Sequence, residues 1–266
     1  MPSTIVTFLS DFGAQDWFVG VVHGIVHELA PSAAVVDLNH LIPPANVVRG
    51  AFILEAAAPD FPPGSVHLAV VDPGVGTERR ALAVRARGAF FVGPDNGLLE
   101  WALAARDAEV HALAEERWFR RPVSRTFHGR DVFAPVAAHL ARGEPIESFG
   151  PRITDPVRLA AAPPRREGDA LVGRVVFIDR FGNALTNLTA ELLDGAFAGP
   201  RDGLRVGLLG REVNGLARSY GDAPVGTLVA VLGSSGRLEI AQVGGDAAVR
   251  LGIGEGDPVT VRPIAG

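Results

Sequence analysis

Short apolar runs alternate with stretches of helical periodicity through the first half of the chain. Residues 4–9 and 34–38 are mostly apolar and β-branched, whereas apolar positions recur every three or four residues between 17 and 29. The alternation continues with helices expected at 46–57, 98–105 and 131–141. A buried strand is expected at 66–71, and a hairpin is expected from the segments 82–87 and 90–92. This pattern predicts an α/β domain over residues 1–150, with a mostly parallel sheet covered on both faces.

The pattern changes after residue 150. Four prolines and a charged run interrupt any helix or strand between 151 and 169, so we expect a linker there. Beyond it, short apolar segments alternate with Gly-rich turns, and Asn214-Gly215 is expected to be a hairpin turn. The expected strands are 171–178, 204–209, 227–232, 237–241 and 259–262. Such spacing predicts an antiparallel sandwich or barrel over residues 170–266.

Composition excludes several kinds of chemistry. Of the 266 residues, 47% are hydrophobic and 21% charged, which is not the composition of a disordered chain. Without cysteine there is no disulfide, thiolate nucleophile or Cys-ligated metal, and without lysine there is no Schiff base or Walker-type phosphate loop. The net charge of −5 and the lack of a basic tract argue against nucleic acid as a partner. No window resembles a membrane span and no export signal is recognised, so we expect a cytoplasmic protein.

Two aspartates follow apolar strands of the first domain. Asp11 ends the first expected strand, and Asp72 directly follows residues 66–71. Either one alone is most simply a turn residue. Because ligands of open α/β sheets bind at the carboxyl ends of the strands, the two together indicate a site.

Histidines give a weaker signal. His128, in Phe-His-Gly-Arg-Asp, lies between glycine and charged residues directly before an expected helix. His23 and His27 have the i, i+4 spacing of a zinc helix, but Gly24 stands where a zinc protease needs its catalytic Glu. We therefore interpret His23 and His27 as ordinary helix residues, and His40 has no motif around it.

Three segments of the second domain carry candidate binding groups. Around one glycine bend, Asp179, Phe181 and Asn183 combine a carboxylate, an aromatic ring and an amide, and a ring with an amide is suited to holding a purine. Tyr220 lies in a polar loop and could stack on a base or close the barrel. The turn 233–236, which contains Ser234, is either a plain hairpin loop or a carboxylate-binding turn.

Six motifs in order carry a family resemblance: SDFG, VVDPGVGTERR, GPDNGL, TFHGRD, IDRFGNALTN and GSSGRLEIA. The sequence resembles the S-adenosylmethionine (SAM) hydrolases that form adenosine, also called SAM hydroxide adenosyltransferases, which are related to the fluorinases and chlorinases. The resemblance implies an N-terminal α/β domain and a C-terminal antiparallel β-barrel. It also implies a homotrimer with sites between the N-terminal domain of one subunit and the C-terminal domain of the next. The implied reaction converts SAM and water to adenosine and L-methionine, without a metal or other cofactor.

The resemblance also implies roles for individual residues. The family's catalytic triad falls on Asp72, Arg79 and His128, and the choice of Arg79 over the adjacent Arg80 rests on its spacing from Asp72. The implied substrate contacts are Asp11 to the ribose, Phe181 and Asn183 to adenine with Tyr220 as a stacking partner, Asp179 to the methionine ammonium, and Ser234 to its carboxylate. Ser235 departs from the halogenases, which carry Arg there.

The chemistry favours hydrolysis over the alternatives. A sulfonium expels a neutral thioether, so the reaction needs no general acid but does need an activated nucleophile. The halogenases have an uncharged residue at the position of Asp72, and an anion there would repel a halide. The alternatives are a SAM-dependent halogenase and a non-catalytic SAM- or adenosine-binding protein. A methyltransferase would need a Gly-rich loop directly after the first strand, where this chain has Ser-Asp-Phe-Gly.

Overall fold

The computed structural model describes residues 4–160 and 162–264, and the chain divides into two compact units, residues 1–160 and 161–266. Within the described residues, no helix is long and apolar enough to cross a membrane.

A six-stranded sheet forms the centre of the N-terminal unit, in the order β2-β1-β3-β5-β4-β6. Its strands are β1 (Ile5–Ser10), β2 (Ala34–Asn39), β3 (Val66–Val70), β4 (Ala81–Ala86), β5 (Ala89–Pro94) and β6 (Glu109–Ala112). β1 pairs in parallel with β2 and β3, and β3 with β5, whereas β4 is antiparallel to β5 and β6. The predicted mostly parallel sheet is confirmed.

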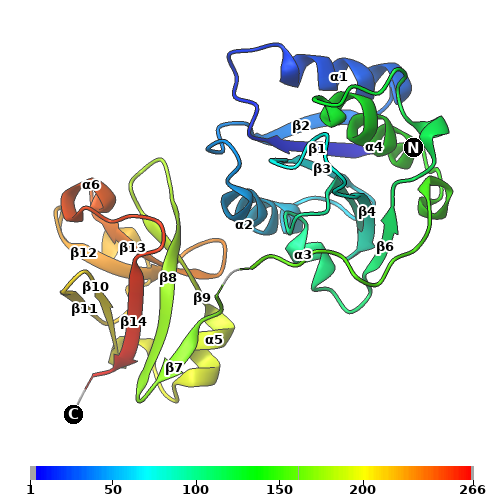
Figure 1. Cartoon of the computed structure of the whole chain (residues 1–266). Helices are drawn as coiled ribbons and strands as arrows, with labels where there is room; N and C mark the ends of the chain where they lie inside the picture. Colours follow the sequence, from blue (N-terminus) through cyan, green and yellow to red (C-terminus); the bar gives the residue numbers. More distant parts are fainter. Residues whose placement is uncertain (1–3, 161, 265–266) are drawn as a thin grey trace. The chain divides into compact units, whose positions relative to one another are not determined.

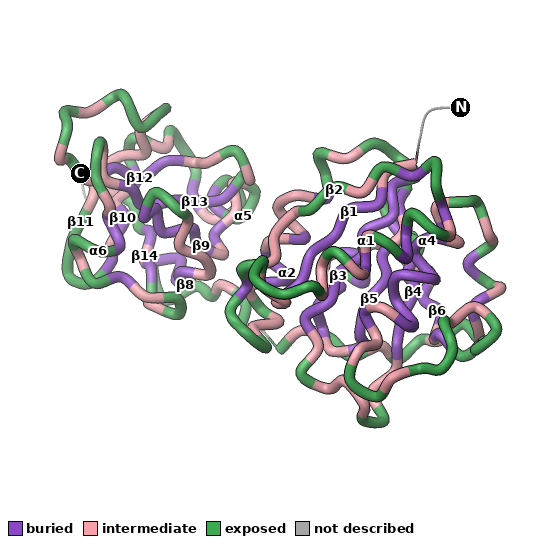
Figure 2. Tube along the Cα trace, turned by 90° about the horizontal axis from the view of Figure 1, so that it is seen from above, coloured by how far each residue is buried: buried purple, intermediate pink, exposed green. Residues whose placement is uncertain are grey.

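Helices cover both faces of this sheet (Figure 1). α1 (Phe18–Leu29) and α4 (Ala134–Ala141) lie on one face, and α2 (Val47–Ala57) and α3 (Glu100–Leu103) lie on the other. Because strand side chains alternate between faces, Phe8 of β1 joins the core under α1 and α4, while the next residue, Leu9, joins the core under α2 and α3. Figure 2 shows that burial is greatest along the central strands, whereas the edge strand β2 is largely exposed.

Two predicted helices of this unit differ in the structure. The segment expected to be helical over 98–105 forms only the four-residue α3, because short i→i+3 hydrogen bonds from Ala102 and Ala105 tighten the chain at both ends. The segment expected over 131–141 begins as a π-helical turn, Gly129–Phe133, and continues as α4. β6 was not predicted from the sequence.

The C-terminal unit is a nearly closed antiparallel barrel with strand order β11-β10-β14-β8-β9-β13-β12, and β7 adds to β8. Its strands are β7 (Arg165–Glu167), β8 (Ala170–Ile178), β9 (Ala184–Thr189), β10 (Leu204–Leu208), β11 (Arg211–Asn214), β12 (Leu228–Leu232), β13 (Arg237–Gln242) and β14 (Pro258–Pro263). A bridge between Ala217 and Val231 brings the segment after β11 beside β12 and so approaches closure. The expected antiparallel barrel is confirmed.

The expected hairpin turn at Asn214-Gly215 is wrong. Asn214 is the last residue of β11, and the turn that joins β10 to β11 is Leu209-Gly210. Both turn residues have positive φ, 49° and 72°, as a tight two-residue hairpin requires. The short helices α5 (Ala190–Ala196) and α6 (Ala247–Leu251) and the strand β9 were also not predicted, and β7 lies within the segment expected to be a linker.

Candidate functional site

Asp11 and Asp72 follow neighbouring parallel strands. Ser10 at the end of β1 is paired with Val70 at the end of β3, so both aspartates lie at the same edge of the sheet. Asp11 Oδ2 accepts a hydrogen bond from the backbone N–H of Ala45, at 2.8 Å. This contact orients the carboxylate of Asp11.

Arg79 joins Asp72 to His128. Its Nε lies 2.9 and 3.1 Å from the two carboxylate oxygens of Asp72, and its Nη2 donates to Asp72 Oδ2 as well. The same Nη2 lies 2.8 Å from Nδ1 of His128. The side chains of Asp72 and Arg79 are only 5% and 11% exposed. A buried ion pair of this kind loses much of its hydration, so its geometry is tightly held.

The contact with Arg79 determines the protonation of His128. A guanidinium can only donate, so Nδ1 of His128 accepts and the proton of the neutral ring is on Nε2. Burial and the positive charge of Arg79 both lower the pKa of His128, which favours the same neutral form. His128 therefore presents an N–H donor at Nε2.

The loop between Asp72 and Arg79 needs glycine at one position. Gly76 has φ +78°, and a Cβ atom there would lie 2.4 Å from the carbonyl oxygen of Arg125. Within this loop, Thr77 Oγ1 donates to the carbonyl of Gly74 at 2.7 Å. These contacts close the turn and return the chain so that Arg79 faces Asp72.

The adjacent arginine has a separate set of partners. Arg80 Nε donates to the buried carboxylate of Asp95 at 2.7 Å, and its Nη1 donates to Asp155 at 2.8 Å. The structure thus brings Asp72, Arg79 and His128 together and directs Arg80 elsewhere.

In the C-terminal unit, Asp179 and Asn183 are brought together by the turn between β8 and β9. Asp179 Oδ1 accepts from the backbone N–H groups of Phe181 and Asn183, at 2.8 and 2.9 Å. Asp179 Oδ2 accepts from the amide Nδ2 of Asn183 at 2.9 Å. Phe181, in this turn, is 75% exposed as a whole residue. An exposed aromatic ring over a rigid polar turn is suited to stacking on a flat ligand.

Tyr220 reaches the same region through Glu239. The hydroxyl of Tyr220 donates to Glu239 Oε2 at 2.5 Å, and the negative charge of Asp179 acts on both groups. Burial, with the charge of Asp179, raises the pKa of Glu239 despite the hydrogen bond from Tyr220. Two acidic side chains thus face one region of the barrel, which favours a cationic ligand group there.

Ser234 and Ser235 occupy the turn between β12 and β13. Ser234 is exposed, and Ser235 Oγ is buried without a hydrogen-bond partner within residues 4–160 and 162–264. A Cβ atom on Gly233 would lie 1.7 Å from Glu239 Oε1, so glycine lets this turn lie directly over the glutamate.

Comparison with known proteins identifies the family. The model of the SAM hydroxide adenosyltransferase N-terminal domain matches residues 6–150, and that of the corresponding C-terminal domain matches residues 173–260. The chain belongs to the SAM hydroxide adenosyltransferase family. The resemblance found in the six motifs is confirmed.

Relatives of this chain align over nearly their whole length. The (R)-S-adenosyl-L-methionine hydrolase of Thermus thermophilus is 46% identical over 265 residues, covering 96% of this chain and 98% of that one. The hydrolase of the same name from Salinispora tropica is 42% identical over 264 residues, 98% of each chain. A fluorinase from Nocardia brasiliensis is 30% identical over 290 residues, 97% of this chain and 96% of its own.

A solved structure has the same fold. The crystal structure of an uncharacterized conserved protein from Thermotoga maritima matches this chain with a TM-score of 0.91 and 37% sequence identity, over 97% of this chain and 99% of that one. Both units therefore follow the architecture of a known protein.

Glu239 is a residue of this candidate site that the sequence analysis missed. It is buried on β13 in the stretch Arg-Leu-Glu-Ile-Ala. The signal that could have found it is the charge itself, because buried acidic residues are rare unless paired.

Proposed function

We propose that this protein hydrolyses SAM to adenosine and L-methionine by attack of water at C5′ of the ribose. The observation that carries the proposal is the buried Asp72–Arg79–His128 group at the carboxyl edge of the sheet. Full-length relatives at 42–46% identity are named as (R)-S-adenosyl-L-methionine hydrolases, which supports the same substrate here.

In the proposed reaction, the water oxygen forms a bond to C5′ while the C5′–S bond breaks. The bonding pair goes to sulfur, which becomes the neutral thioether of methionine. The attacking water loses one proton. His128 cannot accept it at Nδ1, which is bound to Arg79, and its Nε2 carries a proton already. Asp72 has lone pairs beyond those that Arg79 occupies, so Asp72 takes the proton and passes it to solvent.

Arg79 and His128 then act on the developing hydroxide. Nε2–H of His128 donates to the water oxygen and holds it in line with the C5′–S bond. The charge of Arg79 stabilises the anion in a buried environment, where electrostatic interactions are stronger than in water. A fixed donor and a fixed acceptor around one water lower the entropy cost of the attack.

The remaining side chains each bind a different part of the substrate. We assign Asp11 to the ribose hydroxyls, Phe181 and Asn183 to adenine, and Tyr220 to stacking at the base. Asp179 binds the methionine ammonium, helped by the nearby charge of Glu239. Ser234 meets the methionine carboxylate.

The protein is further proposed to act as a homotrimer. Asp11, Asp72, Arg79 and His128 belong to the N-terminal unit, and the adenine and methionine contacts belong to the C-terminal unit. In the proposed trimer, one substrate binds between the N-terminal unit of one subunit and the C-terminal unit of its neighbour.

The test is product analysis. Pure protein is incubated with SAM in halide-free buffer made with oxygen-18 water, and the products are identified by chromatography and mass. Adenosine with the label on its 5′ oxygen, together with methionine, is the expected result. Free adenine would indicate glycosidic cleavage, S-adenosylhomocysteine would indicate methyl transfer, and intact SAM with measurable binding would indicate a binding protein. Each of these results overturns the proposal.

Two further conditions refine the test. Added fluoride or chloride should yield no 5′-halogenated adenosine, because a halide would have to approach the Asp72 carboxylate. Turnover of the separate sulfonium epimers should favour (R)-SAM, as the names of the relatives suggest.

A further inference from the structure

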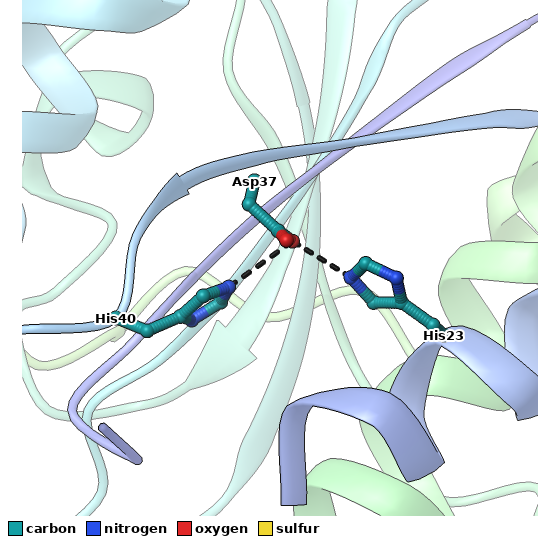
Figure 3. A group of neighbouring side chains, drawn as sticks. All are labelled: His23, Asp37 and His40. Atoms are coloured by element: carbon teal, nitrogen blue, oxygen red, sulfur yellow. Dashed lines mark hydrogen bonds and ion pairs between the residues drawn. The ribbon is translucent and has the colours of Figure 1, made fainter. Parts of the chain in front are cut away.

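Two histidines and an aspartate outside the proposed site converge on one point of the N-terminal unit (Figure 3). His23 extends from α1, Asp37 from β2, and His40 from the residue after β2. Nε2 of His23 lies 2.7 Å from Asp37 Oδ1, and Nε2 of His40 lies 3.1 Å from the same oxygen. One ligand-type atom from each residue lies within 4.8 Å of the other two.

His40 gives the group an unsatisfied nitrogen. Its side chain is only 9% exposed, and apart from the 3.1 Å ion-pair contact with Asp37 Oδ1 its buried Nε2 makes no hydrogen bond within the described parts of the chain. A buried nitrogen without a hydrogen bond costs free energy unless something else occupies it. A bound cation would satisfy it through the lone pair of the neutral imidazole.

The other ring nitrogen of His40 is already fixed. Nδ1 lies 2.7 Å from Ser10 Oγ, which itself accepts from the backbone N–H of Phe12 at 3.3 Å. The ring of Phe8 packs edge-on against the imidazole, with 4.6 Å between ring centroids. Metal-binding histidines have this arrangement, because a hydrogen bond at one nitrogen orients the other toward the metal.

Asp37 supplies charge and access. An aspartate side chain is ordinarily anionic at neutral pH, and its carboxylate oxygen is one of the ligand types that zinc accepts. The side chain of Asp37 is 41% exposed, so an ion can reach the group from solvent and keep water as a further ligand. The site is therefore anionic and open on one side.

We propose that His23 Nε2, Asp37 Oδ1 and His40 Nε2 bind a divalent transition-metal ion, with zinc as the best fit. Two imidazoles and one carboxylate form a donor set typical of zinc, with bonds of about 2.0–2.2 Å. Tetrahedral ligands at that bond length lie roughly 3.3 Å apart. The present separations of 2.7 and 3.1 Å would open by about 0.6 and 0.2 Å, and the two ring nitrogens lie within 4.8 Å of each other.

Such an ion would have a structural role beside the substrate-binding edge. It would tie α1 to the end of β2 and to the segment that follows. The carbonyl of His40 accepts from Gly13 N–H at 2.8 Å, and further along that segment Ala45 N–H donates to Asp11. The ion would thus stabilise the loops that position Asp11. This inference does not rest on the proposed reaction.

The test measures zinc directly. Full-length protein is treated with chelator, desalted, and titrated with zinc sulfate at fixed neutral pH by calorimetry, and zinc per chain is counted after gel filtration. We expect one tight equivalent in the wild type. His23→Gln should weaken binding by about 10–100-fold or more, by comparison with the loss typical of outer-shell changes. His27→Gln, an exposed histidine one turn further along the same helix, should bind as the wild type does.

Crystallography of the zinc-loaded wild type makes the result independent of any variant's folding. An anomalous peak at bonding distance from all three side-chain atoms is expected. Equal zinc binding by wild type and folded His23→Gln would overturn the proposal. So would a wild type that binds no zinc, or a peak located at other residues.

Discussion

Two adjacent arginines have different partners, so substitutions at the two positions form a matched pair of variant and control. Arg79 bridges Asp72 and His128, whereas Arg80 binds Asp95 and Asp155. We expect Arg79→Gln to lower kcat for SAM hydrolysis by about a hundredfold or more, because both other members of the group lose their orientation and the hydroxide loses its counter-charge. Arg80→Gln should lower stability but keep kcat within a few-fold of the wild type.

The measurement is steady-state turnover of SAM, corrected for the folded fraction by circular dichroism. Removing Arg79 also leaves a buried carboxylate unpaired, so stability must be measured in parallel. A folded Arg79→Gln protein with near wild-type kcat would contradict the assignment. The same holds if the Arg80 variant loses kcat to the same extent.

The protonation of His128 should determine how activity depends on pH. Burial and the charge of Arg79 lower the pKa of His128 from the ordinary value of 6.5. Because the neutral form is the one that fits beside Arg79, activity should persist as the pH falls below 6.5 and decline only when the lowered pKa is reached. In a profile of kcat/KM against pH, the wild type and His27→Gln should show the same acid limb below 6.5. A limb at or above 6.5, or an unchanged limb in His128→Gln, would rule out this role for the histidine.

At the scale of residues, the sequence alone identifies some members of the candidate sites and misses others. Asp72, Arg79 and His128 stand in contiguous motifs with defined spacing, so they can be identified without coordinates, and the structure brings them into contact. Glu239 also stands in one of the quoted motifs, but the motif does not indicate its contact with Tyr220, which is 19 residues away and meets Glu239 only in the folded barrel. Asp37 and His40 are close in sequence, but their convergence with His23 depends on how α1 packs against β2.

At the scale of elements, the loop before Arg79 depends on Gly76. Gly76 and Gly143 both have positive φ, 78° and 90°, but only at Gly76 would a Cβ atom meet backbone, 2.4 Å from the Arg125 carbonyl. We expect Gly143→Ala to cost about 1–2 kcal/mol of unfolding free energy from the backbone alone. Gly76→Ala should cost roughly 1–3 kcal/mol more and also lower kcat, because Arg79 is displaced.

Urea unfolding and turnover measured on both variants test this expectation. Equal losses of stability would mean that the chain moves away from Arg125 without strain. Unchanged kcat in Gly76→Ala would mean that this loop does not position Arg79.

His67 makes the central strands sensitive to acid. It lies buried in β3, with Nδ1 at 2.9 Å from Thr7 Oγ1 of β1, and burial lowers its pKa to about 4. The unfolded chain binds this proton near pH 6.5, but the folded chain binds it only near pH 4. The contribution of neutral His67 to the free energy of unfolding is therefore complete above pH 6.5. As the pH falls from 6.5 to 4, the free energy of unfolding decreases by about 3 kcal/mol.

Urea unfolding of wild type and His67→Gln at several pH values measures this effect. The glutamine keeps a polar partner for Thr7 and does not titrate, so the acid-dependent loss should be smaller by about 3 kcal/mol. His27→Gln, which changes an exposed histidine, should leave the wild-type profile intact. Identical profiles for wild type and His67→Gln would show that His67 is protonated equally in both states.

Elements with strong periodicity are the ones that sequence predicts. α1 and α2 lie within one residue of their expected limits, because each has a full apolar face. β9 was missed, because its Thr186 and Asn187 resemble a turn in sequence, whereas Thr186 is in fact buried and donates to the carbonyl of Leu238. The hairpin turn was misplaced because an Asn-Gly pair is the stronger local signal, but the pairing of β10 with β11 and β14 fixes the turn at Leu209.

At the scale of the whole molecule, the proposed assembly divides the substrate contacts between two units. The N-terminal unit holds Asp11 and the proposed water-activating group, and the C-terminal unit holds the turn with Asp179, Phe181 and Asn183. A subunit with a defective N-terminal half can then be complemented by one with a defective C-terminal half. Asp72→Ala and Asn183→Ala are suitable defects, because each should inactivate a homogeneous trimer.

Mixing these two variants under conditions that exchange subunits should restore activity. In random mixing at equal amounts, about three quarters of closed trimers contain both variants, and each of these has one interface with two intact halves. About a quarter of wild-type activity is therefore expected. Native mass spectrometry confirms exchange, and each variant carried through the same procedure alone is the control. No recovery after confirmed exchange, or a fully active monomer, would place the whole site within one subunit.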